Sequence, residues 1–246
     1  MQTTGQQTTQ QAVAIVTGAS SGIGLGLTQA LLKRGWRVVG TARTISNSKN
    51  LKRSSDLVLV DGDVSKKETA IKVVDAAVKH FGRIDLLVNN AGIFIPKAFT
   101  DYTEEDYNLV MNTNVASFFF VTQQVIPQMK KQNSGHVVNI SAVLADQPSS
   151  AAFALLAVLS KSPMPAVSKA LALEYAANNI RFNTVSPGNI NTPMHAKDNH
   201  AALAKFHPLG RMGEISDIVD AVLYLQNATF VTGENIRVDG GVHAGR

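Results

Sequence analysis

The chain has 246 residues, 45% of them hydrophobic and 17% charged, a composition that is typical of a folded globular protein and excludes an intrinsically disordered one. The net charge of +5 comes from Lys and Arg residues that are dispersed along the chain, so we expect no nucleic-acid partner. The absence of cysteine excludes disulfide bonds and thiolate-bound metals, and it favours a cytoplasmic protein.

The N-terminal segment is polar and of low sequence complexity, and it lacks the basic start and the apolar stretch of a secretory signal. We therefore expect a disordered tail over residues 1–11 and one domain over residues 12–246. The longest apolar runs, such as residues 151–159, are shorter than the ~18 residues that a membrane-spanning helix needs, so we expect no membrane contact.

Short, uniformly apolar runs recur along the chain and alternate with segments of helical pattern. The runs are residues 13–16, 38–39, 57–60, 84–88, 137–140 and 180–185, and residues 235–238 are a candidate seventh. Such runs are typical of parallel strands that are buried on both faces. The β-α-β order and the right-handed crossovers of parallel strands predict an α/β fold, a Rossmann-type doubly wound sheet of about seven strands with helices on both faces.

A glycine-rich loop follows the first predicted strand. It reads Thr17-Gly-Ala-Ser-Ser-Gly-Ile-Gly24, and residues 25–34 continue as a predicted helix. Glycines let the backbone turn tightly and approach a pyrophosphate, while the start of a helix offers free amides and the positive end of its dipole. We therefore expect a nicotinamide dinucleotide here; the alternative is a tight turn that serves packing alone. The binding residues would be Gly18, Ser20, Ser21, Gly22, Ile23 and Gly24.

The end of the second predicted strand favours one of the two nicotinamide cofactors. In this type of site an acidic residue binds the ribose 2′-hydroxyl of NAD(H), or a basic residue accommodates the 2′-phosphate of NADP(H). The strand ends at Ala42 without a carboxylate, and Arg43 follows it, with Lys49 as a second cation that could aid it in pairing a phosphate. Because a guanidinium pairs well with a phosphate, NADP(H) is favoured over NAD(H). The alternative is that Arg43 is only a solvated surface charge.

Two later segments carry local signals. Ser65-Lys-Lys-Glu68 matches a capping box and predicts the start of a helix. Residues 192–211 are polar, bracketed by prolines and rich in His and Ala, and they follow the carboxyl end of a predicted strand, where ligands bind in this architecture. We expect this segment to be a substrate lid. Its histidines, His195, His200 and His207, lack the spacing of a metal site, so no metal is expected.

Further motifs are spread along the chain after the glycine loop. They are Asp63-Val64, Asn89-Asn-Ala-Gly92, Asn114 and Ser186-Pro-Gly188, in this order. With them the chain resembles the short-chain dehydrogenase/reductase family, from about residue 13 to residue 241. The resemblance implies that Asp63 and Val64 meet the adenine of the cofactor. It also implies a cofactor channel lined by Asn90, Ala91 and Gly92, with a nicotinamide end at Pro187, Gly188, Ile190 and Thr192. The alternative for residues 89–92 is a purely structural role in the sheet.

Members of this family use four catalytic residues, Asn, Ser, Tyr and Lys, with the last two spaced as Tyr-x-x-x-Lys on one helix face. The resemblance assigns Asn114 and Lys161 to this set, and Lys161 would also hold the nicotinamide ribose. Ala157, however, stands where the tyrosine is expected, and no Tyr-x-x-x-Lys occurs anywhere in the chain. Since the phenol would exchange a proton with the substrate oxygen, the general acid of the family is missing.

The serine of the catalytic set is ambiguous. Family members often read Asn-x-Ser-Ser at this strand end, whereas this chain reads Asn139-Ile-Ser-Ala142. Either Ser141 polarises the substrate carbonyl, or Ser141 is the structural serine of the pair and Ala142 marks a second loss. Hydrogen-bond reach decides between the two, and the sequence does not specify it.

The residues around Lys161 also depart from the family. Pro163 and Pro165 follow it closely, and prolines inside a helix remove a donor and clash with the preceding turn, so a kink or a new helix is predicted near Pro163. Lys161 would then project differently from its counterpart in the family. This helix commonly forms a subunit interface in the family, and residues 151–159 are expected to pack in the core or between the subunits of a homotetramer or homodimer.

These features leave two functions open. The first is an NAD(P)(H)-dependent oxidoreductase that acts on an unknown small-molecule alcohol or carbonyl compound. It would be atypical or slow because of Ala157, with water, Ser141 or a lid histidine as its proton source. The second is a catalytically inactive dinucleotide-binding protein that acts as a sensor, a scaffold or an oligomer partner.

Overall fold

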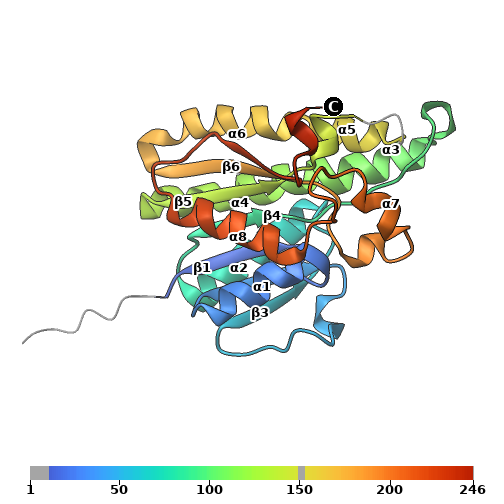
Figure 1. Cartoon of the computed structure of the whole chain (residues 1–246). Coiled ribbons are helices and arrows are strands. Elements are labelled where there is room, and N and C mark those ends of the chain that lie inside the picture. Colours follow the sequence, from blue (N-terminus) through green and yellow to red (C-terminus); the bar gives the residue numbers. More distant parts are fainter. Residues whose placement is uncertain (1–10, 149–152, 246) are drawn as a thin grey trace, which may run out of the picture.

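The structure, a computed structural model, describes residues 11–148 and 153–245 of the chain. Seven parallel strands form one sheet in the order β3-β2-β1-β4-β5-β6-β7 (Figure 1). The strands are β1 (Val13–Thr17), β2 (Arg37–Ala42), β3 (Leu57–Asp61), β4 (Leu86–Asn89), β5 (Gly135–Ile140), β6 (Ile180–Pro187) and β7 (Asn235–Val238). Each strand overlaps one of the predicted apolar runs, and the prediction of a doubly wound α/β sheet is confirmed.

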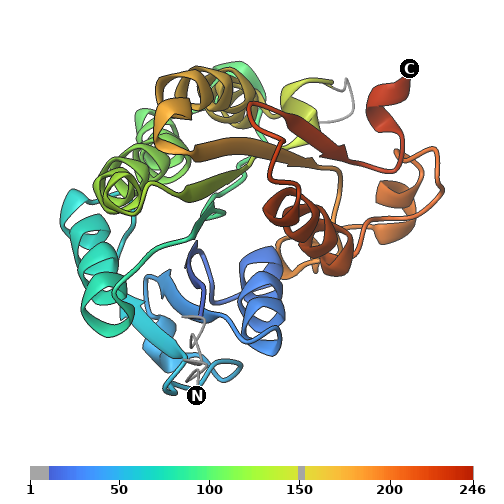
Figure 2. The ribbon, with the colours of Figure 1, turned by 90° about the vertical axis from the view of Figure 1, so that its left-hand side faces the viewer.

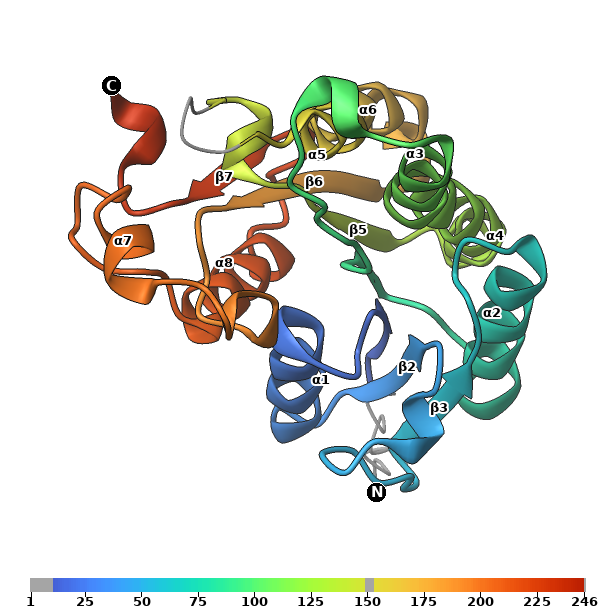
Figure 3. The ribbon, with the colours of Figure 1, turned by 90° about the vertical axis from the view of Figure 1, so that its right-hand side faces the viewer.

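Helices cover both faces of this sheet. They are α1 (Gly22–Lys33), α2 (Lys67–Phe81), α3 (Glu104–Met111), α4 (Ser117–Gln132), α5 (Leu155–Lys161), α6 (Pro163–Glu174), α7 (His200–Ala204) and α8 (Ile215–Asn227). Figure 3 shows α1 and α8 on one side of the sheet and α2, α4 and α6 on the other, and Figure 2 shows the same layers from the opposite end. Each layer closes its own apolar core, with Leu27 and Ile218 in one and Val73 and Val121 in the other. All five residues of β1 are buried because both faces of the sheet are covered.

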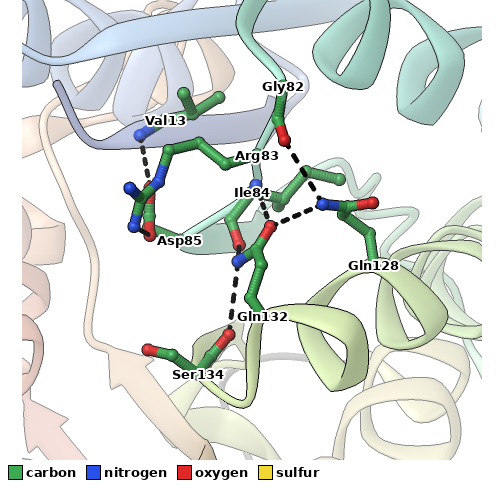
Figure 4. Close-up of polar contacts among 8 residues, drawn as sticks. All are labelled: Val13, Gly82, Arg83, Ile84, Asp85, Gln128, Gln132 and Ser134. Carbon is green, nitrogen blue, oxygen red and sulfur yellow. Dashed lines mark hydrogen bonds and ion pairs between the residues drawn. The ribbon is translucent and has the colours of Figure 1, made fainter. Parts of the chain in front are cut away.

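The start of β4 differs from the prediction, because the apolar run begins at Ile84 and the strand begins at Leu86. The side chain of Gln132, at the end of α4, takes the place of a strand partner for Ile84 (Figure 4). Its Oε1 accepts the Ile84 amide at 2.8 Å and its Nε2 donates to the Ile84 carbonyl at 2.7 Å. Asp85 then accepts the amide of Val13 and pairs with Arg83, which joins this turn to the start of β1. Ile84 is therefore buried and hydrogen-bonded without belonging to the sheet.

Two helix starts also differ from the prediction. Helix α1 begins at Gly22, three residues before the predicted segment, so the last glycines of the loop belong to its first turn. The capping box predicted at Ser65 is wrong. The backbone amide of Ser65 donates to the Asp63 carboxylate at 2.9 Å, and this local turn delays the helix until Lys67, with no side-chain hydrogen bond capping its start.

Parts of two predictions lie outside the described residues. The first is residues 1–10 of the predicted tail. The side chain of the adjoining Gln11 is described, and it donates to the Gly35 carbonyl at 3.0 Å. Residues 151–152 of the apolar stretch are also outside them. Within 11–148 and 153–245, no helix is long and apolar enough to cross a membrane.

Candidate active site

The glycine loop lies where the strand order changes direction. Strand β1 is flanked by β2 on one side and by β4 on the other, and the loop that follows β1 opens at the carboxyl edge of the sheet. This switch point is the binding crevice of open α/β sheets. Gly18 and Gly22 have φ values of +67° and +53°, which favour glycine, and a Cβ at Gly24 would lie 2.3 Å from the Gly18 carbonyl oxygen. This loop, called the glycine cradle below, therefore packs too closely on itself and on residues 90–91 to carry a side chain at Gly18 or Gly24.

Two distant motifs hold this loop in place. The Thr17 hydroxyl accepts the amides of Asn90 and Ala91 at 2.9 and 3.0 Å, and the Asn90 side chain donates to the Thr17 carbonyl at 2.9 Å. Ser21 precedes α1 without capping it through its side chain, so its hydroxyl is left for other partners. The glycine cradle and the channel residues predicted from the resemblance thus form one connected unit.

The predicted nicotinamide end reaches the same unit from the other half of the sheet. Pro187 ends β6, and the amide of Gly188 donates to the Val238 carbonyl at 2.9 Å. Ile190 is buried against Gly213, and the side chain of Thr192 lies 3.5 Å from the place of a Cβ on Gly22. The start of the predicted lid therefore touches the glycine loop, although 170 positions separate Gly22 from Thr192.

The residues predicted around the adenosine part lie at the ends of β2 and β3. Arg43 is exposed and directly follows β2. Burial by itself raises the pKa of Asp63. The hydrogen bonds from Ser65 and the charges of Lys66 and Arg43 outweigh this effect, so the pKa is lowered overall and the carboxylate is charged near neutral pH. Val64 packs into an apolar core, which leaves its backbone rather than its side chain for a ligand.

Asn114 lies in a single turn of π-helix, Asn112–Ala116, between α3 and α4. Its side chain uses both polar atoms inside the protein. The Oδ1 atom accepts the Ile93 amide at 2.9 Å, and the Nδ2 atom donates to the Ile93 carbonyl at 3.1 Å and to the Ser160 hydroxyl at 2.9 Å. Asn114 therefore ties the segment after β4 to α5. Ser160 is a contact that the sequence analysis missed; its only signal is a polar residue within an apolar helix.

Lys161 reaches the carboxyl end of β5. Its Nζ donates to the backbone carbonyls of Ile140 and Ser141 at 3.1 and 3.2 Å, and burial lowers its pKa to about 8. A Cβ at Gly92 would lie 3.4 Å from this Nζ and 3.2 Å from the Asn114 Oδ1 atom. Glycine at position 92 thus lets the backbone after β4 pass close to both side chains.

The helix break predicted from the prolines is confirmed directly after Lys161. Helix α5 ends at Lys161 and α6 begins at Pro163. The first amide of a helix has no partner within the helix, so a proline at this position loses no hydrogen bond. The Ser141 hydroxyl donates to the Lys161 carbonyl at 2.9 Å, at the open end of α5. Ser141 is buried, whereas the neighbouring Ala142 is half-buried. Ala157 lies one turn before Lys161 and is 5% exposed.

The structure therefore brings Asn114, Ser141, Ala157 and Lys161 together. Asn114 and Lys161 line a cavity of about 10 Å³ together with Asn89 and Asn139, whereas Ser141 and Ala157 do not line it. The Asn89 side chain donates to Thr122 and Asn139, while its Oδ1 atom has no hydrogen-bond partner among the described residues. This buried acceptor was not predicted from the sequence.

The three histidines of residues 192–211 are engaged in contacts within or beside this segment. The Nδ1 atom of His195 pairs with Asp198 at 2.7 Å, and the Nε2 atom of His200 contacts the His195 carbonyl at 2.8 Å. His207 is buried, with Nε2 accepting the Asn189 amide at 3.0 Å and Nδ1 contacting the Leu203 carbonyl at 3.1 Å. Across 11–148 and 153–245, no three His, Cys, Asp or Glu side chains are grouped so that they could hold a metal.

A second and larger cavity, of about 420 Å³, lies beside this segment, between the start of α8 and the end of β7. His207, Gly188 and Ile190 line part of it, and charged side chains line the rest together with Leu209, Val238 and several glycines. Most of those charges are already paired, as in the contact of Arg211 with Asp217 at 2.8 Å. The cavity was not predicted from the sequence.

The geometry of the cradle and of Lys161 fits a dinucleotide, and comparisons with known proteins agree. Residues 18–243 match the family model described as enoyl-(acyl carrier protein) reductase. The chain is 35% identical over 243 residues to the 3-oxoacyl-[acyl-carrier-protein] reductase FabG of Thermotoga maritima, covering 94% of this chain and 97% of that one. It is 35% identical over 248 residues to the acetoacetyl-CoA reductase of an Acinetobacter species, covering 95% of this chain and 98% of that one.

Solved structures are similar over the same extent. The structure of ElxO with NADP bound has a TM-score of 0.87 and 26% identity, and it covers 96% of this chain and 100% of its own. A tyrosine-to-phenylalanine variant of ElxO with NADPH bound gives the same values. With a matching family model over most of its length and relatives above one-third identity, this chain belongs to the short-chain dehydrogenase/reductase family.

Proposed function

We propose that the protein is an NADP(H)-dependent oxidoreductase that interconverts an alcohol and a carbonyl compound, with turnover slowed by Ala157. The observation that carries this proposal is the joint placement of the glycine cradle and the Lys161 ammonium at one edge of the sheet. A bound NADPH supplies a hydride to the carbonyl carbon. The protein's own part is to hold the cofactor, to orient the substrate and to deliver a proton.

The preference for NADP(H) rests on the end of β2. Arg43 is exposed there and no carboxylate precedes it in the strand, so a 2′-phosphate would meet a cation rather than an anion. The related structures named for NADP and NADPH support the same cofactor. The relatives named as 3-oxoacyl and acetoacetyl-CoA reductases make 3-oxoacyl thioesters the first substrates to test.

Of the two readings of the serine, the geometry supports a positioning role for Ser141. Its hydroxyl donates a hydrogen bond to the Lys161 carbonyl, and its side chain is buried. We propose that Ser141 anchors the end of α5 and that Ala142, which is half-buried, stands where a carbonyl-polarising serine would stand. Asn114 likewise positions α5 through Ser160 and does not face the substrate with a free amide. The absence of a serine at position 142 and of a tyrosine at position 157 reduces the expected rate.

A catalytically inactive dinucleotide-binding protein is the second candidate, and Ala157 is the observation that favours it. Calorimetric titration with NADPH and NADH, followed by assays with acetoacetyl-CoA and longer 3-oxoacyl thioesters, separates the two. We expect NADPH to bind more tightly than NADH and the thioesters to be reduced slowly. Binding without turnover would favour the inactive candidate, and no binding of either nucleotide would contradict both.

The preference for NADPH has a test of its own in Arg43. Arg43→Glu is expected to weaken NADPH binding and to leave NADH binding unchanged or tighter, since a carboxylate repels the 2′-phosphate and accepts the 2′-hydroxyl. Lys72→Glu, at an exposed position of α2, serves as the control for a general change of surface charge. Equal effects of Arg43→Glu on the two nucleotides would contradict the proposed role.

A further inference from the structure

Building on the proposed oxidoreductase function, we propose that Lys161 itself donates the proton to the substrate oxygen, in place of the tyrosine that the chain lacks. In the family the lysine assists a phenol and holds the nicotinamide ribose. Here Ala157, which is buried, occupies the position one helical turn earlier on the same face of α5, so no phenol competes with Lys161 for a substrate oxygen. Lys161 is half-buried and lines a cavity of about 10 Å³.

The Lys161 ammonium is held in place and still has a proton to give. It carries three N–H groups, and two of them have protein acceptors, the carbonyls of Ile140 and Ser141. These carbonyls belong to the end of β5, at the edge where ligands bind in this fold. With Gly92 opposite, no Cβ screens the Nζ atom on that side. The third N–H is therefore available to a ligand.

The other proton donors near the site are already committed. The Ser141 hydroxyl donates to the Lys161 carbonyl, and the Asn114 amide donates to Ile93 and Ser160. The Tyr102 hydroxyl, in the segment after β4, donates to the Ile95 carbonyl at 2.8 Å. Both ring nitrogens of His207 have partners inside the protein. Among these groups only Lys161 combines a spare proton with a position at the end of β5.

The surroundings of Lys161 suit a general acid. The elements packed around its cavity are β4, the π-helical turn, α4, β5 and α6, and the residues that they place there are amides, a serine and apolar side chains. None of these neighbours is titratable, so burial alone lowers the pKa of Lys161, to about 8. An ammonium with that pKa is charged at neutral pH and gives up its proton more readily than an exposed lysine.

The proton and the electrons balance in this step. As the carbonyl carbon takes a hydride from the reduced nicotinamide, the carbonyl oxygen takes a proton from the Lys161 Nζ atom, and the C=O double bond becomes the C–O single bond of the alcohol. The nicotinamide is oxidised and Lys161 remains as a neutral amine. Lys161 regains its proton from bulk water before the next turnover.

The test compares Lys161→Arg with the parent, and Lys169→Arg, an exposed lysine on α6, is the matched control. Arginine keeps the positive charge, but its pKa is too high for it to act as an acid. We expect kcat for 3-oxoacyl thioester reduction to fall about 10²- to 10⁴-fold in Lys161→Arg, with the NADPH dissociation constant from calorimetry nearly unchanged. The Lys169→Arg variant should equal the parent.

Two further measurements bear on the same step. In Lys161→Ala, added methylammonium should restore turnover in proportion to its concentration, because it supplies the missing acid. The pKa of Lys161, followed by NMR of its ε-methylene group, should lie near 8, and the parent kcat should fall above that same pH. Failure of methylammonium to rescue, or a kcat that does not follow the lysine titration, would count against the proposal.

The outcomes also separate this proposal from the function on which it rests. A parent enzyme that reduces thioesters at the same rate as Lys161→Arg would overturn the proton-donor role and leave the oxidoreductase function standing. A parent enzyme that binds NADPH and reduces no thioester would overturn the function itself. In that case the proton-donor role fails with it, whatever the variants do.

Discussion

At position 157 a methyl group stands one turn before Lys161, and under the proposed function this residue limits the rate of turnover. A tyrosine there would place a phenol beside the Lys161 ammonium, whose charge would lower the phenol pKa and favour proton exchange with the substrate oxygen. The rest of the site depends little on position 157, since Asn114, Ser141 and Lys161 are held by contacts with Ile93, Ser160 and β5.

Ala157→Tyr is therefore expected to raise kcat for 3-oxoacyl thioester reduction, but by less than the about 10²- to 10⁴-fold that a positioned general acid contributes, because Lys161 already supplies a proton in the parent. The measurement is steady-state reduction with NADPH at saturating thioester. Ala157→Phe is the control, because it adds the ring without the hydroxyl and should give no gain. If the two variants reduce thioesters at the same rate, the hydroxyl of residue 157 is not used.

The glycine loop offers a second test at the scale of one residue. A Cβ at Gly24 would lie 2.3 Å from the Gly18 carbonyl and 2.5 Å from the Asn90 Nδ2 atom, so Gly24→Ala must displace the cradle. Gly35→Ala meets nothing within 4 Å, but its φ of +78° is unfavourable for alanine, by about 1 kcal/mol. We expect both variants to lower the thermal stability and only Gly24→Ala to weaken NADPH binding. Equal NADPH affinities of the two variants would exclude a cradle role for Gly24.

At the scale of elements, the hydrogen bonds of Gln132 define where β4 begins. Replacing Gln132 by alanine leaves the buried amide and carbonyl of Ile84 without their partners, a loss of about 2–3 kcal/mol in the free energy of unfolding. Urea denaturation measures this change. Lys131→Ala, at the exposed neighbouring position on α4, should change the stability little. A Gln132→Ala variant as stable as Lys131→Ala would show that Ile84 finds other partners.

A buried histidine joins three elements and predicts a pH dependence. His136, at the start of β5, contacts Gln226 of α8 at 2.8 Å and Asn183 of β6 at 3.1 Å. Burial and the charge of Arg181 lower its pKa to about 3, against a bond to Gln226 that raises it. Since the unfolded chain binds a proton near pH 6.5 and the folded protein does not, this group contributes stability above pH 6.5 that is lost as the pH falls toward 3.

The expected loss is about 1.4 kcal/mol per pH unit below roughly pH 6.5. It is measured as the slope of the unfolding free energy against pH, in the parent and in His136→Gln. The variant should lose this part of the slope, whereas His80→Gln, on an exposed position of α2, should keep it. A slope unchanged in His136→Gln would mean that folding does not lower the pKa of His136.

The elements were predictable from the sequence where a physical signal is local. Apolar runs located the strands because both faces of the sheet are covered, and the prolines located the break after Lys161 because a proline lacks an amide. Contacts between distant side chains have no such signal. The bonds of Gln132 to Ile84 and of Asn114 to Ser160 span 48 and 46 positions, so the start of β4 and the anchoring of α5 became visible only in three dimensions.

At the scale of the whole molecule, the topology explains why the candidate site is built from so many distant segments. The strand order places the ends of β1 and β4 side by side, with the ends of β5 and β6 next in the sheet. Thr17, Asn90, Lys161 and Thr192 can therefore meet at one edge, although no two of them share a strand or a helix. One consequence is that the site depends on the position of α5, which carries Lys161 and Ser160 and whose outer face is apolar.

That outer face of α5 predicts self-association. Leu155 and Leu159 are 43% and 47% exposed, and Phe153 before them is also exposed, so burying this surface against a second copy would remove apolar area from water. We expect Leu155→Asp/Leu159→Asp to shift a dimer or tetramer toward monomer in sedimentation velocity. Ile71→Asp is the matched control, since Ile71 is 40% exposed on α2, which packs on α4. Because α5 also carries Lys161, separation of the subunits should weaken turnover together with assembly; an unchanged sedimentation profile would place the interface elsewhere.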